Sequence, residues 1–149
     1  MRSGKIAIVD DDEAVRLSTG SLVEHSGHEV ALFASGDDFL HRAVMEEISC
    51  IILDMQMPGR DGLAVLRELR ERGQTPPVVV ITGHGDIGVA VDAMKLGAFD
   101  FMEKPYAPED LLQAIETAQQ SRRQTSDARA VSQEAVALVE TLSQRQRQV

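Results

Sequence analysis

Apolar and polar positions alternate along the chain in two recurring patterns. Short runs rich in Ile and Val indicate β-strands, which we predict at residues 5–9, 29–33, 50–53, 78–81 and 99–103. Longer segments with apolar side chains at helical spacing separate these runs and predict helices at residues 13–25, 37–44, 61–72, 87–96 and 108–119. The runs IAIV, CIIL and VVVI are apolar throughout, as is typical of strands covered on both faces. Five strand–helix repeats therefore predict a doubly wound α/β fold with a parallel sheet.

Glycine, proline and aspartate mark the ends of the predicted helices. Gly73 follows a helical segment, where a left-handed conformation favours glycine. Asp86 precedes the fourth predicted helix and is a candidate N-cap. Pro58 and Pro108 are expected at helix starts, where the missing N–H of proline costs nothing.

Length and charge narrow the class of protein. The chain has 149 residues, which suits one domain, and its 24 acidic and 15 basic side chains give a net charge of −9. Because an acidic surface repels phosphate backbones, we do not expect the chain to bind DNA by itself. No apolar run reaches the ~18 residues that a membrane span needs, so we expect no membrane association. The single cysteine, Cys50, excludes a disulfide framework and fits the cytoplasm, where we expect the protein.

Polar side chains that could bind a ligand or take part in a reaction lie where the predicted strands end. Doubly wound folds place their functional sites at the carboxyl ends of the strands, and five residues of this sequence lie there: Asp10, Asp11, Asp54, Thr82 and Lys104. Clustered carboxylates repel one another, so we expect their pKa values to rise unless a cation compensates. Their oxygen ligands favour a hard divalent ion such as Mg²⁺, and the lack of His and Cys in the group disfavours zinc.

Each of these residues also has an ordinary structural explanation. An acidic triplet such as DDD is most often a solvated turn, and an aspartate after an apolar strand is commonly a helix cap. A threonine after such a strand often only ends it. The shared position at one edge of the sheet favours a functional site over these explanations.

Four stretches resemble the receiver domains of bacterial two-component response regulators: IAIVDDDEAVR, IILDMQMPGRDGLAVL, VVVITGHGD and AMKLGAFDFMEKPY. The resemblance covers residues 5–120 essentially without interruption, and LDMQMPGRDG is its most specific segment. It implies a flavodoxin-like sheet of five strands in the order 2-1-3-4-5, with Asp54 as the phosphoacceptor. It also implies that Asp11, Asp54 and the backbone carbonyl of Gln56 hold Mg²⁺ directly, while Asp10 acts through a water molecule.

The resemblance also assigns a phosphoryl site and a switch. Thr82 and Lys104 would contact the phosphoryl oxygens, and Thr82 with Phe101 would change conformation on phosphorylation. The phosphoryl donor would be a cognate sensor histidine kinase. The segments ITGHGD and GAFDFMEKP resemble the FixJ-like subfamily, which implies a homodimer on phosphorylation, with candidate contact residues Val91, Met94, Lys95 and Asp100.

Composition changes near Ser121, where Gln, Ser, Arg and Thr replace the apolar pattern. We therefore predict a receiver domain at residues 1–120 and a helical linker at 121–149. Four apolar residues share one stripe of this tail at helical spacing: Val131, Ala135, Leu138 and Leu142. The final LSQRQRQV resembles the first helix of a LuxR-type helix-turn-helix domain, so we expect a receiver from a longer transcription regulator that binds DNA only through its full-length output domain. The alternative is a solvated extension of the last receiver helix.

Three functions remain open at the level of sequence. The first is a phosphorylation-controlled switch in transcription regulation, which catalyses only its own phosphorylation and slow dephosphorylation. The second is a Mg²⁺-dependent phosphohydrolase with an aspartyl-phosphate intermediate, but such enzymes generally need a second aspartate where this chain has Gln56, which cannot transfer a proton. The third is a stand-alone DNA-binding protein, against which the charge of −9 argues. The pattern favours the switch.

Overall fold

The protein is a three-layered α/β structure around one parallel sheet. The structure, a computed structural model, describes residues 4–59, 61–73 and 76–131. The sheet has five strands: β1 (Lys5–Val9), β2 (Val30–Phe33), β3 (Ile48–Asp54), β4 (Val78–Thr82) and β5 (Asp100–Glu103). All four pairings are parallel, and the spatial order is β2-β1-β3-β4-β5. The flavodoxin-like fold predicted from the sequence is thus confirmed.

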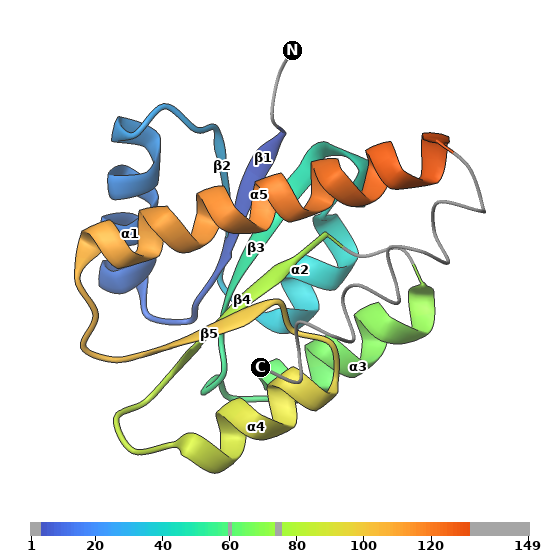
Figure 1. Ribbon diagram of the computed structural model, residues 1–149. Helices are drawn as coiled ribbons and strands as arrows, with labels where there is room; N and C mark the ends of the chain where they lie inside the picture. The colour runs from blue at the N-terminus through green and yellow to red at the C-terminus, as the bar shows by residue number, and fades with distance from the viewer. Residues whose placement is uncertain (1–3, 60, 74–75, 132–149) are drawn as a thin grey trace.

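Helices cover both faces of this sheet (Figure 1). The chain forms α1 (Glu13–His25), α2 (Gly36–Arg42), the short 3₁₀ helix η1 (Met45–Glu47), α3 (Gly62–Arg72), α4 (Ile87–Lys95) and α5 (Pro108–Val131). Side chains of α1 and α5 pack on one face, and those of α2, α3 and α4 pack on the other. None of the helices in the described ranges is long and apolar enough to cross a lipid bilayer.

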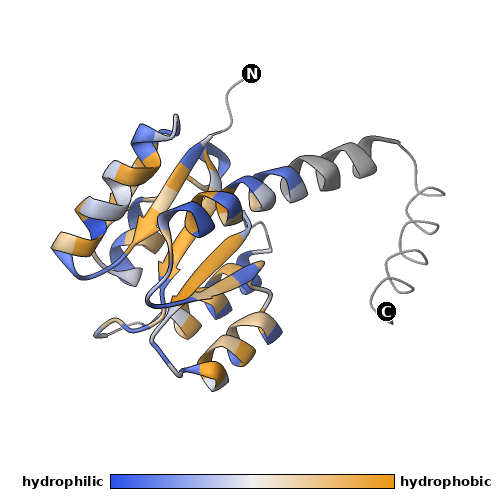
Figure 2. Ribbon diagram, turned by 60° about the vertical axis from the view of Figure 1, so that its left-hand side comes forward, coloured by the Kyte–Doolittle hydropathy of each residue, from blue (hydrophilic) through white to orange (hydrophobic). Residues whose placement is uncertain are grey.

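Alternate side chains of the strands supply two separate cores. Ile6, Ile8 and Ile52 face α1 and α5, where Leu111 and Ile115 of α5 are completely buried. Their sequence neighbours on the strands face the opposite helices and contact residues such as Phe39, Val65 and Leu69. Figure 2 shows the apolar colour concentrated on the strands between the two helical layers. Burial on both faces is the physical reason for the continuous apolar runs in the sequence.

Several helices and strands begin or end at other residues than the sequence predicted. The third strand begins at Ile48, before the predicted residue 50, because Ile48 and Ser49 are buried and the strand pairs with Lys5 at its start. The second helix spans Gly36–Arg42 in place of residues 37–44, since Ser35 caps its start and the backbone turns extended at residue 43. The expectation that Pro58 begins a helix is wrong, because Asp61 is the N-cap of α3.

The last helix continues beyond the predicted end of the receiver. Helix α5 runs without a break from Pro108 to Val131, across the composition change at Ser121. The division into residues 1–120 and 121–149 remains a prediction. The apolar stripe and the LSQRQRQV segment predicted for the tail lie at or beyond residue 131, and residues 132–149 are outside the described part of the chain.

Candidate phosphoacceptor site

Three carboxylates meet where β1 and β3 end. Asp10 and Asp11 directly follow β1, and Asp54 is the last residue of β3. Because β1 and β3 are paired neighbours, their carboxyl ends lie at one edge, and one carboxylate oxygen of each residue lies within 4.8 Å of the others. Asp10 and Asp54 are buried, whereas Asp11 is exposed. The predicted cluster of carboxylates is therefore present, with two buried members and one that faces solvent.

Backbone and side-chain hydrogen bonds fix the orientation of the two buried aspartates. Asp10 Oδ1 accepts the N–H of Asp12 at 2.9 Å, and Arg16 Nη1 donates to the carbonyl of Asp10 at 2.8 Å. Asp54 Oδ1 accepts the N–H of Gln56 at 3.2 Å. One oxygen of each buried carboxylate thus has a backbone donor, and the second has no hydrogen-bond partner among the described residues. This arrangement can present carboxylate oxygens to a cation or to an incoming phosphoryl group.

Burial dominates the electrostatics of this pocket. It raises the pKa of Asp54 to about 6, although the N–H of Gln56 and the charge of Lys104 act to lower it and the charge of Asp10 raises it further. Burial also raises the pKa of Asp10. A carboxylate that is costly to ionise gains from a nearby cation. The oxygen-only donor set and the accumulated negative charge therefore fit Mg²⁺, which prefers such ligands.

Lys104 and Thr82 complete the edge of the site on the side of β4 and β5. The Lys104–Pro105 peptide bond is cis, and the N–H of Lys104 donates to the carbonyl of Thr82 at 2.9 Å. The ammonium of Lys104 is close enough to lower the pKa values of both buried aspartates. The buried hydroxyl of Thr82 donates to the carbonyl of Met102 on β5 at 3.4 Å. All five strand-end residues predicted from the sequence thus lie at this edge of the sheet.

Three contacts at the site were not predicted. Arg16 donates to the carbonyl of Asp10 and so supports the turn that carries this aspartate. The sequence signal for this contact is a basic side chain in the first turn of α1, where acidic side chains are favoured. Glu103 Oε2 accepts the N–H of Gly85 at 2.9 Å and ties the loop after β4 to β5. The Gln56 side chain donates to Asp86 at 2.7 Å. The last two contacts join distant segments, and no local pattern in the sequence predicts them.

Residues 6–116 match the model of the response regulator receiver domain. The chain belongs to this family. Magnesium and phosphorylation are typical of receiver domains, and receivers of FixJ-like regulators work with histidine kinases.

Curated relatives of this receiver are transcriptional regulators. It is 39% identical over 146 residues to the transcriptional regulatory protein FixJ of Bradyrhizobium diazoefficiens, covering 98% of this chain and 71% of the relative. It is 44% identical over 149 residues to the response regulator protein TodT of Pseudomonas putida, covering 99% of this chain and 65% of the relative. The chain therefore spans about two thirds of the length of such regulators.

Solved structures agree with this placement. The crystal structure of FixJ-N superposes with a TM-score of 0.74 at 38% identity and covers 80% of this chain and 96% of its own. Full-length FixJ from B. japonicum gives a TM-score of 0.79 at 36% identity over 95% of this chain and 70% of that protein.

The receiver domain has an apolar surface on α4 and β5. A hollow of about 340 Å³ is lined by Ile87, Ala90, Val91, Met94, Lys95 and Phe101. The Phe101 side chain is 39% exposed, and Val91 and Met94 are exposed to a similar degree. Asp100 is half-buried and its carboxylate accepts the N–H of Phe101 at 2.8 Å. Of the four predicted contact residues, Val91, Met94 and Lys95 line this hollow, which we call the α4–β5 face, and Asp100 precedes Phe101 on β5 but is not among the lining residues.

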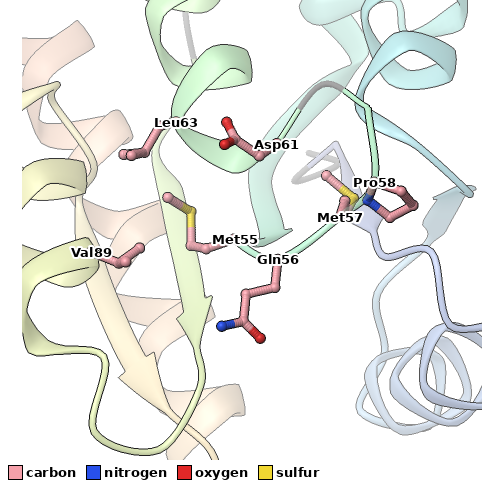
Figure 3. A pocket seen from close by; sticks show the side chains of 7 residues that line it. All are labelled: Met55, Gln56, Met57, Pro58, Asp61, Leu63 and Val89. Atoms are coloured by element: carbon pink, nitrogen blue, oxygen red, sulfur yellow. The ribbon is translucent and has the colours of Figure 1, made fainter.

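A second hollow of about 480 Å³ lies beside the loop that follows β3. Figure 3 shows Met55, Leu63 and Val89 turned toward one another in this hollow, with Asp61 beside Leu63. The side chain of Gln56 points away from this group. Met55, the residue after Asp54, thus faces α3 and α4, while the side chain of Gln56 contacts Asp86 in the loop before α4.

Proposed function

We propose that Asp54 accepts a phosphoryl group from a sensor histidine kinase and that the resulting aspartyl phosphate switches the interactions of the protein. The observation that carries this proposal is the meeting of the Asp10, Asp11 and Asp54 carboxylates within 4.8 Å at the strand ends. In the transfer, an oxygen of Asp54 forms a bond to phosphorus as the P–N bond of the phosphohistidine breaks, and the imidazole leaves with the electron pair.

The surrounding residues position and neutralise the transferring group. Mg²⁺ would be held by Asp11, Asp54 and the carbonyl of Gln56, with Asp10 acting through a water molecule, and it supplies charge neutralisation when bound. The Lys104 ammonium offsets the negative charge of the phosphoryl oxygens. Thr82 donates its hydroxyl to one of these oxygens after it releases the carbonyl of Met102. Gln56 cannot act as a proton donor in hydrolysis, so we propose a switch in place of a turnover enzyme.

The output of the switch is a dimer through the α4–β5 face. A phosphoryl group adds roughly −1.5 to −2 charges and three acceptor oxygens. When Thr82 moves toward these oxygens, it vacates space that Phe101 can fill by turning inward. A two-fold contact is self-complementary, so Lys95 of one copy can face Asp100 of the other while Val91 and Met94 supply apolar contact. In the full-length cytoplasmic protein, this dimer would control a DNA-binding output domain and so transcription.

Intact mass spectrometry tests the phosphoacceptor directly. Incubation with acetyl phosphate and Mg²⁺ should add one phosphoryl, a gain of about 80 Da. Asp54→Asn should abolish the gain, because an amide is a far weaker nucleophile, whereas Asp110→Asn at the exposed start of α5 should leave it unchanged. A full gain in Asp54→Asn would rule out this residue as the acceptor. Sustained consumption of excess acetyl phosphate would favour the phosphohydrolase.

A further inference from the structure

The first turn of α4 differs from those of the three preceding α-helices. Asp12, Ser35 and Asp61 are the N-caps of α1, α2 and α3, and each side chain accepts a hydrogen bond from the N–H three residues later. Asp86 is the N-cap of α4 and has the right side chain for the same bond, yet it makes no side-chain capping bond. Its equivalent donor is the N–H of Val89.

The Asp86 carboxylate is bonded elsewhere. Gln56 Nε2 donates to Asp86 Oδ2 at 2.7 Å, which joins the loop after β3 to the residue that starts α4. Gly83 leaves the space for this contact, because a Cβ at that position would lie 2.9 Å from Asp86 Oδ2 and 3.5 Å from Gln56 Nε2. The bond therefore depends on two loops, one after β3 and one after β4, that meet at the edge of the phosphoacceptor site.

The backbone of Asp86 matches this alternative contact. The capping residues Asp12 and Asp61 have extended backbones with ψ values of 112° and 178°, whereas Asp86 has ψ of 54°. An extended conformation is the one in which an N-cap side chain reaches the first turn of its helix. In its present conformation, Asp86 thus accepts from Gln56 and does not cap the first turn of α4.

We propose that the side chain of Gln56 is a positioning residue that holds Asp86 away from the first turn of α4. This inference rests on the proposed function for its consequence, because Gln56 lies two residues after Asp54 and would offer its carbonyl to Mg²⁺. A change at the phosphoacceptor that moves Gln56 releases Asp86. The freed carboxylate then caps α4 and stabilises the turn that carries Ile87, at the start of the α4–β5 face.

Hydrogen exchange of single backbone amides, followed by NMR on the unphosphorylated protein, tests the first half of this inference. Gln56→Ala should free Asp86 and increase protection of the Val89 N–H about fivefold, the usual effect of one side-chain cap. The N–H of Ala64 holds the same position in α3, is bonded to Asp61 at 3.0 Å, and should not change. A merely structural defect would lower protection, so an increase is specific to the proposed exchange of partners.

Asp86 variants complete the cycle. Asp86→Ala alone should leave Val89 protection at the wild-type level, because the cap is not formed while Gln56 holds the carboxylate. In the Asp86→Ala background, Gln56→Ala should have no effect on Val89. Loss of protection in Asp86→Ala would mean that Asp86 already caps α4, and unchanged protection in Gln56→Ala would mean that Gln56 restrains nothing. Either result overturns the proposal.

Beryllofluoride with Mg²⁺, a phosphoryl mimic, tests the coupling in the wild-type protein. It should raise Val89 protection to the level of Gln56→Ala without beryllofluoride. Bound beryllofluoride with Val89 unchanged would overturn the coupling and leave the proposed phosphoacceptor function intact. If beryllofluoride does not bind at Asp54, both the proposed function and the coupling fail. The intact-mass experiment detects failure of the proposed function separately.

Discussion

Asp10 and Asp54, at the ends of neighbouring strands, hold carboxylate oxygens within 4.8 Å of each other although both side chains are buried. Burial raises the pKa of each, and the charge of Asp10 adds to the rise at Asp54. Lys104 offsets part of this repulsion but lies on the far side, after β5. Without a bound cation, the negative charges of these two carboxylates therefore oppose folding. Several measurable properties follow from this.

Mg²⁺ should stabilise the folded protein. A ligand that binds only the native state adds about 2.7 kcal/mol at a hundredfold excess over its Kd, which corresponds to several degrees in Tm for a chain of this size. Asp11→Ala removes the exposed ligand and should reduce this shift. Thermal melts with Mg²⁺ or with chelator, at matched ionic strength, measure the effect. Superimposable melts would contradict a metal site in this pocket.

The metal-free protein should lose stability as pH rises through about 6. Folding raises the pKa of Asp54 from 3.8 to about 6, so the native state holds this proton more tightly than the unfolded chain does. The associated stability is complete below pH 3.8 and is lost as pH rises through about 6. The Asp54→Asn variant has a neutral amide in place of the carboxylate that ionises. In chelator it should melt above the wild type at about pH 8, and the difference should shrink toward about pH 5. A constant difference would contradict the raised pKa.

Gly62 should tolerate no side chain. A Cβ at this position would lie 2.8 Å from the Cα of Met55 and 3.1 Å from the carbonyl of Asp54, both backbone atoms. Gly62→Ala should therefore cost about 1–3 kcal/mol in the free energy of unfolding and slow phosphorylation by displacing Asp54. Gly88 in α4 has no atom within 4 Å of such a Cβ, so Gly88→Ala is the matched control and should not destabilise. Urea denaturation and the rate of mass gain measure the two effects, and equal values for both variants would contradict the steric argument.

Thr82→Ala should separate phosphorylation from dimer formation. Without its hydroxyl, residue 82 cannot form a hydrogen bond to a phosphoryl oxygen. The shift that vacates space for the Phe101 side chain is then lost. We expect sedimentation velocity to show a dimer of the wild type with beryllofluoride and Mg²⁺, and a clearly weaker dimer of Thr82→Ala, while acetyl phosphate still adds mass to both. A normal dimer of the variant would contradict the Thr82–Phe101 route. A wild type that stays monomeric at micromolar concentrations would contradict dimerisation of this chain.

The sequence by itself determined the elements and the edge at which the site lies. Ile8, Ile52 and Val79 belong to apolar runs that only a sheet covered on both faces can bury. A parallel sheet places the residues after such runs at one edge, so Asp10 and Asp54 could be predicted at the same edge before the distance between them was known. This inference needs only the alternation of elements and the direction of the strands.

Other features depended on contacts between distant segments. The sequence predicts Asp86 as an N-cap from its local position, but the tertiary structure brings Gln56 within 2.7 Å, and the carboxylate bonds there. Pro58 was expected at a helix start, but the helix begins after Asp61, where Gly62 packs against the backbone of Met55. Local sequence sets which conformations a residue favours. Which partner a polar side chain finds is decided by the packing of loops from separate strands, because the competing hydrogen bonds differ little in free energy.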